Sequence, residues 1–108
     1  MARGLSGAVP DVKFLTNAAQ VLVCVAREPG TRLRDIAECV GITERATHRI
    51  VCELEAGGYI TRHREGGRNF YEVHPDLPLD HDSDSAAPIG ALLRLLISVP
   101  RNAKLDAA

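Results

Sequence analysis

Aromatic residues are scarce in this sequence of 108 residues: they make up 4% of it, and tryptophan is absent. A core must therefore be built from Leu, Ile, Val and Ala, which suits packed helices better than a β-sandwich. Long apolar runs are missing as well. The best candidate, residues 89–99, is shorter than the ~20 residues that a membrane span needs, and it contains Arg94. We therefore expect no membrane partner.

Cysteines are few, and none of the three belongs to a CxxC motif. Because Cys24, Cys39 and Cys52 are widely spaced, neither a disulfide framework nor a zinc ribbon is expected. Each is expected to act as a small buried hydrophobe, with Cys52 as the one alternative candidate for a redox-sensing thiol. Residues 1–7 lack the basic-then-apolar pattern of a secretion signal, which predicts a cytoplasmic location.

An excess of positive charge is also absent. Thirteen Lys and Arg residues against fourteen Asp and Glu residues give a net charge of −1, which excludes a basic tail that coats nucleic acid by charge alone. The sequence has no phosphate-cradling glycine loop, nucleophile elbow or paired carboxylates. We therefore expect no enzyme, and no catalytic residue, metal site or cofactor. The arginines are placed unevenly, however: the stretch from Arg32 to Arg68 contains seven of them, these two included.

The spacing of the apolar residues predicts a helical first half. Three helices are expected, over residues 17–27, 33–40 and 44–56. Gly41 can adopt the positive φ that turns the chain after the second helix, and Thr43 can cap the third. The buried stripe expected on the third helix is Ala46, Ile50 and Leu54.

After the third helix, the spacing of the apolar residues changes from the helical repeat to a repeat of two residues. Residues 59–64 and 69–73 are rich in β-formers and flank a glycine pair, which predicts a hairpin with Tyr71 facing the core. Residues 88–99 are expected to form a further helix, which is apolar on nearly all sides. Its apolar surface must therefore be covered by other parts of the protein or by a second chain. The expected fold class is α+β, mainly α with a small β-hairpin.

This order of elements is a winged helix-turn-helix with an additional C-terminal helix. The expected divisions are a flexible arm (1–12), the winged domain (13–79), an acidic linker (80–87), a dimerisation helix (88–99) and a tail (100–108). The dimerisation contacts expected on the last helix are Leu92, Leu93 and Leu96.

Several polar side chains occupy positions from which such a domain contacts DNA. Arg45 and Arg49 on the third helix could each form a bidentate pair with guanine in the major groove. The wing arginines bracket the glycine tip, as expected for a probe of the minor groove or the phosphates. The expected DNA contacts are Arg32, Arg34, Thr43, Arg45, Thr47, His48, Arg49, Arg62, Arg64 and Arg68. The alternative is a winged helix module for protein–protein interaction that does not bind DNA.

Two segments resemble the MarR-type winged helix regulators, and more closely a short, actinobacterial-type branch of them: FLTNAAQVLVCVAREPG and RLRDIAECVGITERATHRIVCELEAGGYITRHREGGRNFYEVHP. The resemblance implies a homodimeric transcription regulator of double-stranded DNA. The helix 43–56 would read the major groove, and the wing 59–73 would contact the backbone or the minor groove. Such relatives often hold a ligand between the winged domain and longer dimerisation helices. Those helices are short here, so the sequence leaves a small-molecule effector undecided.

Overall fold

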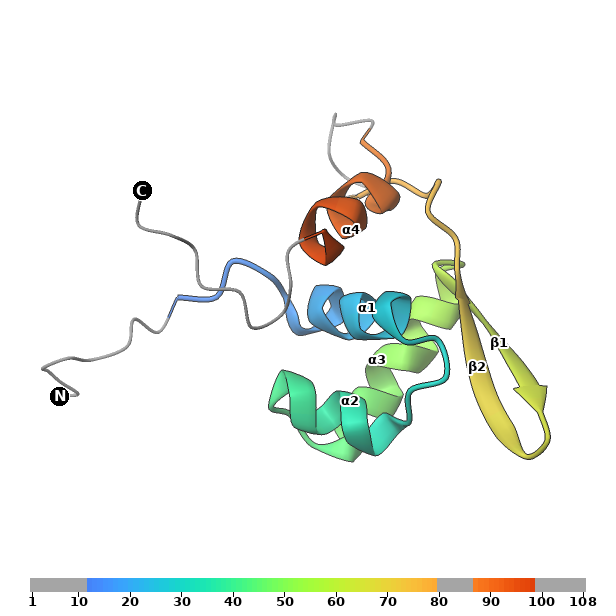
Figure 1. Cartoon of the computed structure of the whole chain (residues 1–108). Helices are drawn as coiled ribbons and strands as arrows, with labels where there is room; N and C mark the ends of the chain where they lie inside the picture. The colour runs from blue at the N-terminus through green and yellow to red at the C-terminus, as the bar shows by residue number, and fades with distance from the viewer. Residues whose placement is uncertain (1–11, 80–86, 99–108) are drawn as a thin grey trace, which may run out of the picture.

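The computed structural model describes residues 12–79 and 87–98. The described residues form four helices and a two-stranded antiparallel hairpin that extends away from them (Figure 1). The elements are α1 (Asn17–Arg27), α2 (Leu33–Val40), α3 (Glu44–Ala56), β1 (Ile60–Glu65), β2 (Arg68–Val73) and α4 (Ile89–Ile97). This layout confirms the α+β fold class and the winged helix-turn-helix with an added helix. The expected arm, acidic linker and tail lie almost entirely outside the described residues.

Local signals set the helix boundaries. Thr16 caps α1, with its hydroxyl accepting a hydrogen bond from the Ala19 N–H at 3.1 Å. Thr43 caps α3 in the same way through the Ala46 N–H at 3.0 Å. Between α2 and α3, Gly41 adopts a φ of 86°, a left-handed conformation that side chains disfavour. The tight turn predicted from the sequence is thus present.

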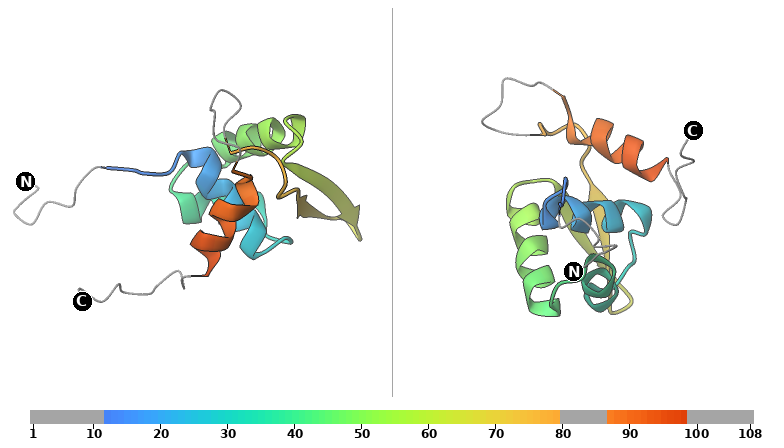
Figure 2. Two further views of the ribbon diagram at one scale, coloured as in Figure 1. Left: turned by 90° about the horizontal axis from the view of Figure 1, so that it is seen from above. Right: turned by 90° about the vertical axis from the view of Figure 1, so that its left-hand side faces the viewer.

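Helix α1 lies at the centre of the molecule. It packs against α2, α3, β2 and α4, and two further views show α4 lying across α1 (Figure 2). Buried apolar side chains from all of these elements form one core: Val21, Leu22, Val25, Ile36, Ile50, Val51, Ile60, Tyr71, Ile89 and Leu93. Only one of these is aromatic, so the core is built from aliphatic residues as the composition predicts.

The hairpin is held by its turn and by its base. Gly66 and Gly67 have φ values of 56° and 81°, and positive φ at both positions is what a two-residue type I′ turn requires. The strands pair from Ile60 with Val73 to Glu65 with Arg68. The Tyr71 N–H donates to the Pro29 carbonyl at 3.0 Å, which ties β2 to the connection between α1 and α2.

Helix α4 belongs to the same core as the winged domain. The Ile89 and Gly90 N–H groups donate to the carbonyls of Leu77 and Pro75 at 2.7 and 2.9 Å, which seats the start of α4 on the chain that follows the wing. Leu93 is only 5% exposed, because it packs into the core of its own chain. It was expected to be a dimerisation contact, but in this conformation its side chain cannot reach a second chain. In the part of the chain that the structure describes, every helix is too short to span a membrane.

Candidate nucleic-acid interface

Helix α3 buries only part of the predicted stripe, and its buried face is shifted. Ile50 is buried as predicted and Ala46 and Leu54 are half-buried, whereas Thr47 and Val51 are buried although they were not predicted to be. Thr47 is 0% exposed, and its hydroxyl donates to the Thr43 carbonyl at 2.9 Å. Thr47 was expected to contact DNA, and this expectation is wrong for the structure because the side chain is enclosed in the core.

The shift of the buried stripe places two arginines at the centre of the exposed face. Arg45 and Arg49 are both exposed and lie about one turn apart, so they project from the same side of α3. His48 is exposed beside them, and its Nε2 atom lies 3.8 Å from Sγ of half-buried Cys52. Two guanidinium groups at this spacing are suited to bidentate contacts with guanine edges.

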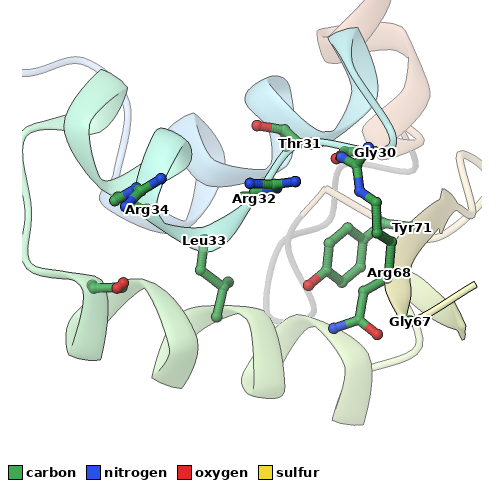
Figure 3. A pocket seen from close by; sticks show the side chains of 10 residues that line it. Gly30, Thr31, Arg32, Leu33, Arg34, Gly67, Arg68 and Tyr71 are labelled. Atoms are coloured by element: carbon green, nitrogen blue, oxygen red, sulfur yellow. The ribbon is translucent and has the colours of Figure 1, made fainter.

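A pocket of about 420 Å³ joins α2, α3 and the wing. Figure 3 shows Arg32 and Arg34 at the start of α2 and Arg68 reaching across from β2. The pocket lining also includes Glu44, the first residue of α3. No side chain caps the start of α2, so its first N–H groups can donate hydrogen bonds to another partner. Three guanidinium groups around such a helix end form a site suited to a phosphate.

Two of the wing arginines have structural partners. Arg62 forms an ion pair with Glu55 of α3, with an N–O distance of 3.5 Å. Arg68 donates to the Gly30 carbonyl at 2.6 Å and stacks over the Phe70 ring, 5.7 Å from its centroid. These contacts hold the wing against α3 and against the connection between α1 and α2. They give Arg62 and Arg68 a positioning role that spacing in the sequence does not indicate.

The remaining polar groups of the wing set its local charge. Arg64 is exposed on β1, near the glycine tip. On the other face, Nε2 of His63 lies 2.9 Å from a carboxylate oxygen of Glu72, and this hydrogen bond lowers the pKa of Glu72. Burial raises the pKa of Tyr71, whose ring lines the basic pocket. A phenol is already neutral at neutral pH, and the raised pKa moves Tyr71 further from ionisation, so Tyr71 adds no negative charge there.

The structure brings Arg32, Arg34 and Arg68 into one pocket and leaves Arg45, His48 and Arg49 on the adjoining helix face. Glu44 and Asn69 also line this pocket, which the sequence did not predict. No local signal identifies them, because their place in the lining depends on how the wing docks.

The apolar surface of α4 also differs from the expectation. Leu92 and Leu96 are half-buried, whereas Leu95, which was not among the expected dimerisation contacts, is 66% exposed. Within residues 12–79 and 87–98, no three His, Cys, Asp or Glu side chains gather in a way that could hold a metal ion.

Comparisons with known proteins agree with this geometry. A model of the MarR family matches residues 11–68, and proteins of this family are transcription regulators and not enzymes. The chain is also similar to a solved structure described as the "crystal structure of the predicted DNA-binding transcriptional regulator from E. coli". The two are 18% identical with a TM-score of 0.52, and the match covers 74% of this chain and 73% of that chain. At this identity the likeness shows the fold alone. No curated protein matches the chain.

Proposed function

The chain belongs to the MarR family of transcription regulators, and we propose that it binds double-stranded DNA in a sequence-specific manner. One observation carries the proposal. The starts of α2 and α3 and the wing meet at a single pocket, and three arginines, Arg32, Arg34 and Arg68, line it. Three guanidinium groups in one place can offer several charge-assisted hydrogen bonds to a phosphate of a DNA backbone, which favours DNA over a protein partner.

Base reading is assigned to α3 in this proposal. Arg45 and Arg49 would enter the major groove and donate to guanine O6 and N7 atoms. His48 and Thr43 are exposed next to them and would contact bases or phosphates. Thr47 has no part in the readout, because its side chain is buried.

Backbone contacts are assigned to the pocket and to the wing. Arg32 and Arg34 would bind a phosphate together with the N–H groups at the start of α2. Arg64 would contact the backbone or the minor groove from the wing, which the Arg62 and Arg68 contacts hold in place. The pocket arginines fix the orientation of the protein on the duplex, and α3 supplies the specificity.

A homodimer is also part of the proposal. Leu95 and Ile97 of α4 are exposed apolar side chains, next to half-buried Leu92 and Leu96. A second copy would cover this surface and would present two α3 helices to two half-sites of one duplex. Leu95→Glu should therefore shift sedimentation from dimer to monomer, while Arg94→Glu on the same helix should not. A wild-type protein that sediments as a monomer at every concentration would contradict the dimer.

The binding test uses the full-length protein and DNA duplexes enriched from a random pool. Arg45→Ala and Arg49→Ala should each weaken binding to the enriched duplex by ~1–3 kcal/mol and relax its sequence preference. Arg94→Ala removes the same charge from α4 and should leave both quantities unchanged. If the wild type shows no salt-dependent affinity for any duplex, the DNA proposal fails and a protein–protein interaction module becomes the better account.

A further inference from the structure

Helices α1 and α2 bring two cysteines together that are 15 positions apart in the sequence. The Sγ atoms of Cys24 and Cys39 lie 3.5 Å apart, which is a contact distance between two sulfur atoms. A disulfide bond is about 2.05 Å long, so the two sulfurs need to approach by roughly 1.5 Å to form one. Cys24 is half-buried and Cys39 is exposed. The pair is thus close enough to react and open to solvent on one side.

Both cysteines line a pocket of about 650 Å³ between α1, α2 and the end of α4. A reagent can therefore reach the sulfur atoms without unfolding the domain. The charged residues in the lining are one arginine and three acids: Arg27, Glu28, Asp35 and Glu38. Because the acids outnumber the arginine, the pocket favours a small neutral reagent over an anionic one.

We propose that Cys24 and Cys39 form a dithiol site that a hydroperoxide oxidises to an intramolecular disulfide. In the first step the sulfur of exposed Cys39 attacks a peroxide oxygen, which leaves a sulfenic acid on Cys39 and releases one molecule of water (or of alcohol). In the second step the sulfur of Cys24 attacks the Cys39 sulfur, the S–S bond forms and the hydroxyl leaves as water. Two thiols lose two electrons, and one peroxide gains them.

The disulfide would link the two helices at one end of the domain. Cys39 lies in the last turn of α2, and the basic pocket lies at the first turn of the same helix. The bond would therefore restrain α2 against α1 without occupying the DNA-binding surface. It closes a short loop of the chain, so we expect the oxidised protein to unfold at a temperature several degrees higher than the reduced protein.

The test exposes the full-length protein to hydrogen peroxide, blocks the remaining thiols with an alkylating reagent, and maps the disulfide-linked peptides without reduction. We expect a linked peptide that joins Cys24 to Cys39, with Cys52 alkylated. Cys52→Ala is the matched control and should form the same link. Cys24→Ser removes the second sulfur, so Cys39 should persist as a sulfenic acid that dimedone traps.

Three results would overturn the proposal. The first is a protein in which peroxide oxidises Cys39 to sulfinic acid and no link to Cys24 forms. The second is a disulfide that joins two chains, visible as a covalent dimer on a non-reducing gel. The third is faster oxidation by glutathione disulfide, an anionic reagent, than by an equal concentration of peroxide. Peptide mapping of the wild type decides the first two results, so they do not depend on a variant that folds.

Discussion

Removal of Arg32 and Arg34 should change the salt dependence of DNA binding by a predictable amount. Both side chains are exposed and line the basic pocket at the start of α2, whose N–H groups have no side-chain cap. Each phosphate contact contributes about 0.9 to the slope of log affinity against log salt. Arg32→Ala with Arg34→Ala should therefore reduce the slope by ~1.8. Between about 50 and 200 mM salt, the wild type should then lose roughly tenfold more affinity than the double variant.

The assay is fluorescence anisotropy of a labelled duplex at several salt concentrations. Arg94→Ala on α4 is the matched control, because it removes an exposed positive charge that does not line the pocket. Each single variant in the pocket should lower the slope by ~0.9, and the control should leave it unchanged. Equal slopes for the double variant and the wild type would refute phosphate binding in the pocket. A control that lowers the slope as much as Arg32→Ala would show that net charge, and not position, sets the salt dependence.

Three further substitutions test the packing and the electrostatics of the site. Thr47→Val removes the hydroxyl that donates to the Thr43 carbonyl, so urea denaturation should show that the free energy of unfolding falls by about 1 kcal/mol, while DNA affinity stays the same. Weaker DNA binding by the folded variant would contradict the buried position of Thr47. Gly90→Ala would place a Cβ atom 2.6 Å from Cβ of Pro75 and 3.0 Å from the Pro75 carbonyl oxygen. We therefore expect the free energy of unfolding to fall by about 1–3 kcal/mol in the same assay, with faster hydrogen exchange in α4. Unchanged stability would contradict this close packing. Glu44→Gln removes the acidic side chain from the basic pocket, so affinity for a random duplex at low salt should rise a few fold. A lower affinity would contradict the repulsion of a phosphate by Glu44.

The local parts of the fold could be predicted from the sequence. The bounds of the first three helices follow from apolar spacing and from strong end signals, such as the threonine cap at Thr43 and the glycine turn at Gly41. The hairpin follows from Gly66 and Gly67, because few other residue pairs adopt positive φ at two successive positions. These signals lie within a few residues of the feature that they determine. They therefore need no knowledge of tertiary contacts.

The rotation of α3 could not be predicted in the same way. A helical repeat of 3.6 residues allows either a stripe that includes Ala46 and Ile50 or one that includes Thr47 and Val51. The choice depends on the packing of α1 against α3, which is a contact between distant parts of the sequence. Threonine counts as polar in a pattern, yet its hydroxyl can be satisfied by a carbonyl in the same helix. This is why Thr47 was assigned to the wrong face.

The roles of the wing arginines depend on long-range contacts as well. The pairing of Arg62 with Glu55 and the hydrogen bond from Arg68 to the Gly30 carbonyl both join residues on different elements. The basic pocket itself exists only because the wing docks next to the start of α2. The sequence indicates which arginines are available for DNA. Tertiary structure decides which of them have other partners.

Selection of bound duplexes from a random pool by the full-length protein tests the central claim most directly. The proposed readout by Arg45 and Arg49 in a dimer predicts an enriched motif with two inverted half-sites whose centres are about one helical turn apart. The variant with both Arg45→Ala and Arg49→Ala should still retain DNA at low salt but should enrich no motif. A wild-type protein that enriches no sequence, or whose enriched motif persists unchanged in this variant, would contradict base reading by α3.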